Sequence, residues 1–140
     1  MRCGFALAAK AVIIRDGKVL VLVRSAKEIS SSYLNKNEPW DLPGGGVRFH
    51  ENCMEGLLRE IDEETSLKVR GVKPLRVFDV IKNQLHMTIF TYLCVYRSGE
   101  EVLSEEHERY YWLSLKEAED MKVPKWMLKD IKLAFNELKQ

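Results

Sequence analysis

The stretch that most constrains the fold runs from Gly45 to Leu67, where a glycine-rich loop leads into an amphipathic helix. From Asn52 onward the apolar residues recur at i, i+3, i+4 and i+7, so one helical stripe is expected to face a core. Asn52 suits an N-cap, and Glu55 at position N3 makes a variant of the capping box. The apolar stripe consists of Met54, Leu57, Leu58 and Ile61.

Three carboxylates follow on the same helix, and we expect them to form one patch opposite the apolar stripe. Glu60 and Glu64 are one turn apart, and Glu63 is the i+3 neighbour of Glu60. Each like-charge pair costs a few tenths of a kcal/mol, roughly 0.2 to 0.5, in an exposed helix, a cost that a divalent cation among the oxygens would offset. Oxygen ligands favour Mg²⁺ or Mn²⁺. The alternative is an ordinary solvated acidic face.

The loop before the helix, Pro43 to Gly46, has three consecutive glycines. Glycine backbone adopts positive φ easily and lets carbonyl or amide groups approach an ion or a phosphate closely. The sequence therefore predicts a loop and a helix whose carboxylates point back at the loop.

The spacing of these residues resembles the signature of the Nudix hydrolases, and Trp40-Asp41-Leu42 before the glycines resembles the same family. One position departs from the signature, because Ser66 occupies the place of a glycine at the expected helix end. A left-handed residue commonly ends a helix there, and a serine should be tolerated at a cost of about 1 kcal/mol. The matching positions are Gly45, Glu51, Arg59, Glu60, Ile61, Glu63, Glu64 and Leu67.

The resemblance implies an α+β Nudix fold, in which a mixed β-sheet core is sandwiched between α-helices. It also implies a metal-dependent hydrolase that cleaves the pyrophosphate bond of a nucleoside triphosphate or of a nucleoside diphosphate linked to another group. Arg59 is expected to pair with Glu51 and hold the loop against the helix, with a phosphate clamp as its alternative role. The implied Mg²⁺ or Mn²⁺ ligands are Glu60, Glu63 and Glu64, with a carbonyl of Gly44 or Gly45.

Composition fits a single domain over residues 1–140, because 46% of the residues are hydrophobic and 31% are charged. The formal net charge of +1, with 22 basic and 21 acidic residues, favours neither duplex nucleic acid nor a membrane as a partner. The sequence leaves a homodimer open. Three widely spaced cysteines match no zinc or redox motif, and no signal peptide is expected in residues 1–11, so we expect a cytoplasmic protein.

Two hairpins are expected. The first joins residues 8–15 to 18–24 through Asp16-Gly17, and the second joins 68–81 to 85–96. The polar segment 25–39 between the first hairpin and the glycines should be a loop.

The C-terminal third should contain short elements. We expect strands at 101–103 and 110–113, an acidic loop at 104–109, a brief helix opened by a capping box at Ser114, and a last helix whose first turn holds Pro124.

Substrate residues are harder to identify. Arg24, Lys27, Tyr33 and Phe49 flank the predicted site in sequence and could meet phosphates or a base, although each also suits ordinary surface. Trp40 suits packing better than base stacking, and His50 suits a solvated loop.

The resemblance also implies a general base in a loop remote from the signature. The acidic loop holds Glu105, Glu106 and Glu108, of which Glu106 is favoured because Glu-His before an aromatic strand recurs in the family. A carboxylate there would contribute about 10² to 10⁴ in rate. If none of the three acts, Glu60 or Glu63 becomes the candidate.

Two alternatives remain from other functional classes. One is a catalytically silent Nudix-fold sensor that binds a nucleotide, which the retained carboxylates argue against. The other is an RNA-end processing hydrolase, which the balanced charge argues against.

Overall fold

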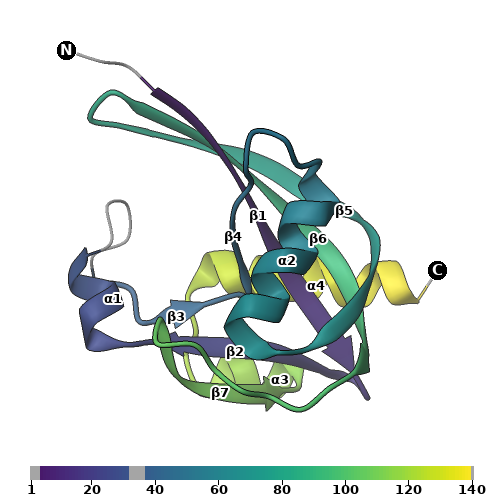
Figure 1. The fold of residues 1–140 in the computed structure, drawn as a ribbon. Helices are drawn as coiled ribbons and strands as arrows, with labels where there is room; N and C mark the ends of the chain where they lie inside the picture. Colours follow the sequence, from purple (N-terminus) through teal and green to yellow (C-terminus); the bar gives the residue numbers. More distant parts are fainter. Residues whose placement is uncertain (1–3, 32–36, 140) are drawn as a thin grey trace.

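The computed structural model describes residues 4–31 and 37–139, and its strands form one sheet around β1 (Figure 1). The main strand order is β3-β2-β1-β6-β5, while β4 pairs with β1 and β7 pairs with β2. The strands are β1 (Gly4–Arg15), β2 (Lys18–Arg24), β3 (Trp40–Asp41), β4 (Gly44–Gly46), β5 (Lys68–Lys82), β6 (Leu85–Ser98) and β7 (His107–Leu113). The helices are α1 (Ala26–Ser31), α2 (Cys53–Thr65), α3 (Leu115–Asp120) and α4 (Lys125–Leu138).

Both predicted hairpins are present. β1 pairs antiparallel with β2, and the connecting Asp16 and Gly17 both have positive φ, as a tight two-residue hairpin turn requires. β5 pairs antiparallel with β6, and the residues between them, Asn83 and Gln84, also have positive φ.

The sheet is mixed because β1 runs parallel to β6, from Gly4 opposite Leu85 to Ile14 opposite Val95. Parallel neighbours require a long crossover connection. Here the crossover includes α2, which places the predicted site helix on one face of the sheet.

Side chains of β1 alternate between two hydrophobic clusters. Ala9, Ala11 and Ile13 pack with Leu57 and Ile61 of α2 on one face of the sheet. On the opposite face, other β1 side chains pack against α3 and α4 in the second cluster, the α4-side cluster. This cluster includes Val12, Ile14, Ala118, Met127, Ile131 and Ala134. This arrangement confirms the predicted α+β fold with a mixed sheet between helices.

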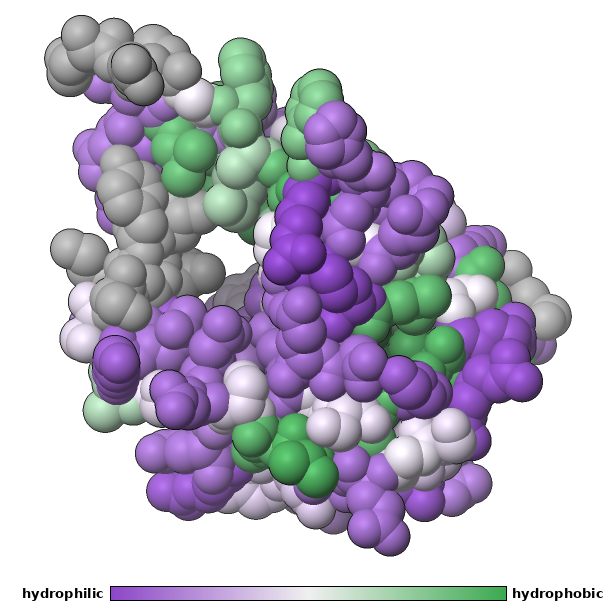
Figure 2. Space-filling view, in the orientation of Figure 1, coloured by the Kyte–Doolittle hydropathy of each residue, from purple (hydrophilic) through white to green (hydrophobic). Residues whose placement is uncertain are grey.

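The start of β1 and the tip of the β5–β6 hairpin extend beyond the helices as an arm (Figure 1). Phe5 is 86% exposed and Ile81 is 71% exposed, so the arm displays large apolar side chains. Figure 2 shows green, hydrophobic residues in this part of the view, while the surface over α2 is mainly hydrophilic.

The prediction of a loop over residues 25–39 was wrong at its start, because Ala26–Ser31 forms α1. The Ser25 hydroxyl accepts a hydrogen bond from the Glu28 amide at 3.1 Å, which supports the first turn. The rest of that prediction falls partly on residues 32–36, outside the described part of the chain.

The expected strand at residues 101–103 was also wrong, since these residues form no strand. β7 instead begins at His107, three residues before the predicted start, because its first residue already pairs with Arg24.

The predicted capping box of α3 is confirmed at Ser114 and Glu117, while Pro124 is the N-cap of α4 rather than a residue of its first turn. Within the described ranges, no helix is long and apolar enough to cross a membrane.

Candidate active site

The site helix α2 begins and ends as its sequence predicts. The side chain of Asn52 accepts a hydrogen bond from the Glu55 amide at 2.9 Å, which satisfies one free amide of the first turn. Ser66 has φ of 63° and ψ of 15°, so a left-handed residue ends the helix although it is not glycine.

The glycine loop forms β4 and packs between β1 and α2. Gly44 has φ of 129°, and a Cβ there would collide with the Ala9 carbonyl. A Cβ on Gly45 would lie 2.9 Å from the Glu60 carboxylate. Glycine is therefore required at Gly44, where a side chain would push the loop away from the strand, whereas a side chain at Gly45 would displace the Glu60 carboxylate.

The pairing register distinguishes the two carbonyls that the sequence offers as metal ligands. The Ala11 amide donates to the Pro43 carbonyl, and the Val47 amide donates to the Leu7 carbonyl, at the two ends of the β1–β4 pairing. Because hydrogen-bonded residues alternate along an antiparallel pair, the carbonyl of Gly45 points toward Ala9. Gly44 faces the other way, and its carbonyl accepts from Lys10 Nζ at 3.0 Å. Of the two predicted carbonyls, that of Gly44 faces the site.

Glu64 does not share the solvent-facing patch that the sequence predicts. It is only 4% exposed, because it lies three residues after Ile61 and seven after Leu57 and therefore continues the buried stripe. Its Oε1 accepts from the Gly44 amide at 2.9 Å. Burial raises the pKa of Glu64 well above its ordinary value, and attraction by Lys10 and the Gly44 bond offset only part of that shift.

Glu60 and Glu63 occupy the more open side of the helix. Arg59 Nη1 lies 3.2 Å from an oxygen of each. Partial burial raises the pKa of Glu60, against the opposing influence of Arg59. The side chain of Glu63 is 51% exposed. The solvent exposure of the three predicted ligands thus increases from buried Glu64 through partly buried Glu60 to exposed Glu63.

Arg59 binds Glu51 through two hydrogen bonds, Nε to Oε2 at 2.6 Å and Nη2 to Oε1 at 2.9 Å. Nη2 also donates to the Gly46 carbonyl at 3.0 Å. The hydrogen bonds from Arg59, joined by one from the Arg48 amide, lower the pKa of Glu51 to about 2. This geometry favours the structural ion pair over the phosphate clamp, since the guanidinium already holds the loop against the helix.

Glu106 lies beside Glu64. Carboxylate oxygens of both residues and one ring nitrogen of His107 lie within 4.8 Å of one another. The segment before Glu106 is fixed to α2 by a main-chain bond of 3.0 Å from the Ser104 amide to the Glu64 carbonyl. Of the acidic residues in the predicted loop, Glu106 alone belongs to this described cluster.

A buried polar network that the sequence analysis missed continues from this cluster. Lys10 Nζ donates to Asp41 Oδ1 at 3.0 Å, and His107 Nε2 lies 2.9 Å from Asp41 Oδ2. Burial opposes both charges of the Lys10–Asp41 pair. At Lys10 the attraction of Asp41, Glu64 and Glu60 together outweighs burial and raises the pKa. At Asp41 the attraction of Lys10 and the contact with His107 together outweigh burial and lower the pKa. The available signal was a charged residue inside an apolar strand, Lys10 between Ala9 and Ala11.

A cleft of about 400 Å³ opens on the α4 face of the sheet, beside Lys10 and Asp41. Arg24 lines it, but its guanidinium also donates to the Glu38 carbonyl at 2.8 Å and the Glu28 carbonyl at 3.1 Å. Phe49 is 94% exposed and does not line this cleft. Tyr33 lies outside the described residues.

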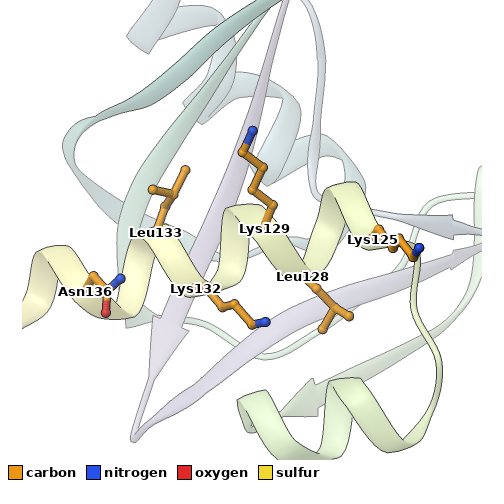
Figure 3. Close-up of a pocket in the computed structure, with 6 residues that line it drawn as sticks. All are labelled: Lys125, Leu128, Lys129, Lys132, Leu133 and Asn136. Carbon is orange, nitrogen blue, oxygen red and sulfur yellow. The ribbon is translucent and has the colours of Figure 1, made fainter.

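A second hollow of about 370 Å³ lies along the outer side of α4 and holds no carboxylate (Figure 3). Its polar lining is Lys125, Lys129, Lys132 and Asn136, joined by two leucines. Without an acidic or nucleophilic group, this hollow does not compete with α2 as the reactive centre.

The donor set fits a divalent cation. Glu64 is buried with one amide donor and no ion pair in the described part of the chain, and Glu106 and His107 point donor atoms at the same place. Glu60, Glu64 and Glu106, with the Gly44 carbonyl, could hold Mg²⁺ or Mn²⁺ here. Glu63 remains a predicted ligand on the exposed side.

A mixed sheet between helices, with a glycine strand against a carboxylate-bearing helix, defines the Nudix class of folds. The chain belongs to this family, because residues 4–133 match the family described as NUDIX domain. A crystal structure of a MutT protein from Methanosarcina mazei Go1 superposes with a TM-score of 0.78 and 26% identity, covering 100% of this chain and 99% of that one.

Curated relatives match a shorter region. Nucleoside triphosphatase NudI of Escherichia coli O17:K52:H18 is 33% identical in an 85-residue alignment that covers 53% of this chain and 60% of that protein. The asymmetrical bis(5'-nucleosyl)-tetraphosphatase of Mus musculus is 33% identical in an alignment of 85 residues that covers 56% of this chain and 58% of that protein. The chain thus spans about three fifths of these relatives.

Proposed function

We propose that the protein hydrolyses a phosphoanhydride bond of a nucleotide with Mg²⁺ or Mn²⁺. The substrate we infer is a nucleoside triphosphate or a nucleoside diphosphate linked to another group. Family membership supports this proposal, as do the two curated relatives, whose names describe a nucleoside triphosphatase and a bis(5'-nucleosyl)-tetraphosphatase.

The observation that carries the proposal is the burial of Glu64 beside Gly44 and Glu106. A carboxylate taken out of water without a matching cation is costly, and a divalent ion supplies the missing charge. When bound among such oxygens, the ion neutralises phosphate charge and activates water as a nucleophile.

The protein's own groups would orient and deprotonate the reactants. Glu51 and Arg59 hold the glycine loop at a fixed distance from α2, so that the Gly44 carbonyl and Glu64 keep their relative positions. Glu106 would accept a proton from an attacking water, a role that its exposure at the rim and its nearness to Glu64 support.

The cleft beside Lys10 suits the nucleotide. Its volume of about 400 Å³ lies in the range usual for small-molecule sites, and aromatic side chains in its wall offer surfaces for a base. Arg76 and Lys10 also line the cleft, each paired with a carboxylate, that of Asp130 or of Asp41. The aromatic residues are Trp40, Phe78 and Trp126.

Hydrolysis assays on a panel of nucleotides test this function. The panel contains nucleoside triphosphates, dinucleoside polyphosphates and nucleoside diphosphate sugars, each assayed with Mg²⁺ and with Mn²⁺. Mass spectrometry of the products should find cleavage between phosphates that requires the ion. Nucleotide binding without product under every condition would favour the silent sensor instead.

The RNA-end alternative has one observation in its favour. Lys125, Lys129 and Lys132 recur on one side of α4 beside Trp126 of the cleft, and none forms an ion pair in the described chain. Replacing all three with glutamine should leave mononucleotide hydrolysis unchanged. A selective, salt-dependent loss of activity on RNA ends would instead support an RNA substrate.

A further inference from the structure

His107 lies at a break in strand pairing and close to Glu64 of α2. β7 pairs with β2, and the register shifts where Arg24 faces His107 and Val23 faces Arg109. Tyr111 packs with the α4-side cluster, so strict alternation from Tyr111 would place His107 on that side as well. The shift breaks this alternation, and a ring nitrogen of His107 lies within 4.8 Å of a carboxylate oxygen of Glu64.

The two ring nitrogens of His107 are not equivalent. Nε2 is 2.9 Å from Asp41 Oδ2, and the other oxygen of Asp41 accepts from Lys10 at 3.0 Å. An ionised carboxylate only accepts hydrogen bonds, so Nε2 carries the proton, and in the neutral ring Nδ1 then holds a lone pair. Nδ1 is buried and has no hydrogen-bond partner among the residues that the structure describes, in a side chain that is 1% exposed.

This arrangement is the one that orients metal-binding histidines. A histidine ligand usually donates its second ring N–H to a carboxylate, which fixes the ring and its tautomer. Asp41 fills that role here, and its own position is fixed by Lys10.

One ring nitrogen of His107 lies near the oxygen donors. A ring nitrogen of His107 and oxygens of Glu64 and Glu106 lie within 4.8 Å of one another. Bonds of about 2.0 to 2.2 Å to one ion allow donors up to about 4.4 Å apart. The three donors thus lie close to the separation that one ion would need.

We propose that Nδ1 of His107 is a ligand of the divalent ion held by Glu64 and Glu106. The inference rests on the metal site of the proposed function and adds a nitrogen to its oxygen donors. Imidazole suits transition metals, whereas Mg²⁺ prefers oxygen ligands. The site is therefore selective for Mn²⁺ over Mg²⁺.

A purely structural His107 would orient Asp41 and would make no bond to the ion. Pulsed EPR of bound Mn²⁺ separates the two roles, because a directly bound nitrogen modulates the electron spin echo. The sample is the full chain without a histidine tag, loaded with one equivalent of Mn²⁺.

His107→Gln is the test variant, and His86→Gln is its matched control. His86 also contacts a carboxylate through Nε2, that of Asp79 at 3.1 Å, but it lies on the arm and outside the cluster. Nitrogen modulation is expected in the wild type and in His86→Gln, and is expected to be lost in His107→Gln. The Mn²⁺ dissociation constant should rise about 10- to 100-fold in His107→Gln, and that for Mg²⁺ less than about threefold.

Labelling the wild-type protein with [¹⁵N]histidine tests the same bond without any substitution, should His107→Gln fail to fold. The ¹⁴N modulation should be replaced by a ¹⁵N pattern. Wild-type protein that binds Mn²⁺ without nitrogen modulation would overturn the ligand role and leave the proposed function standing. Wild-type protein that binds neither ion would overturn both.

Discussion

The two long helices each bury one carboxylate, and the protein neutralises them in opposite ways. Asp130 of α4 is 1% exposed, and the Arg76 guanidinium binds both of its oxygens. Glu64 of α2 is 4% exposed and receives one main-chain amide, while the nearby Lys10 donates to Asp41 and to main-chain carbonyls.

The difference in partners distinguishes a structural carboxylate, Asp130, from one at the candidate site, Glu64. A buried carboxylate with a bidentate arginine is satisfied and ties its helix to the sheet. A buried carboxylate without such a partner has a raised pKa, as Glu64 has, and lowers stability at neutral pH unless a cation binds. Perturbed groups of this kind concentrate at functional sites.

Removing the charge of Glu64 should have the largest effect. Glu64→Gln should lower kcat/KM by about 10³-fold or more, about 4 kcal/mol, because a ligand of the ion is lost. Steady-state kinetics with Mg²⁺ and Mn²⁺ measures this, and activity within about threefold of wild type would refute the assignment.

The same variant should unfold at an equal or higher temperature in metal-free buffer. Because the folded-state pKa is raised, the folded protein holds the proton more tightly than the unfolded chain does. Wild-type stability should therefore decline as pH rises above the ordinary carboxyl value of 4.5. Glu64→Gln should lack this decline in a calorimetric pH series.

The variant Glu106→Gln tests whether Glu106, at the exposed edge of the cluster, takes part in catalysis. Glu106→Gln should lower kcat by about 10²-fold with little change in KM, since proton transfer occurs in the transition state. Glu105→Gln and Glu108→Gln are controls from the same segment. If all three variants keep wild-type kcat, the base lies elsewhere, and Glu60 or Glu63 becomes the candidate.

Asp130 should behave as the opposite of Glu64. Asp130→Ala should lower the free energy of unfolding by about 2 to 4 kcal/mol, since it leaves the partly buried Arg76 without its partner. Glu137→Ala, which breaks the exposed pair of α4 with Lys73, should cost less than about 1 kcal/mol. Urea unfolding measures both, and equal losses would contradict the distinction between buried and exposed pairs.

The smallest effect is expected at the end of α2. Ser66→Gly should stabilise the protein by about 0.5 to 1 kcal/mol, because Ser66 has a φ that glycine adopts without strain. A clear loss of stability in urea would mean that the serine side chain supports the helix end in some other way.

Sequence patterns correctly predicted the elements that depend on residues close together in the chain. The caps of α2 and α3 and both hairpin turns depend on residues within a few positions of one another. The burial of Glu64 was missed because its charge was read as a surface signal, although its spacing from Leu57 and Ile61 belongs to the core stripe.

The polar network could not be predicted because its members meet only through strand pairing. Lys10, Asp41 and His107 lie on β1, β3 and β7, which other strands and helices separate in sequence, so the local pattern of each strand does not set its register against the other two. A single residue of shift at Val23 and Arg24 decides where His107 points.

The parallel pairing of β1 with β6 also sets an order of assembly. Ala9 pairs with Phe90, more than half the chain away, and the glycine strand lies against the other edge of β1. Contacts so distant in sequence form slowly, because a long loop must close before they add stability. A chain emerging from the ribosome can fold α2 early, yet its carboxylates meet Lys10 and Glu106 only after β6 and the start of β7 have been synthesised.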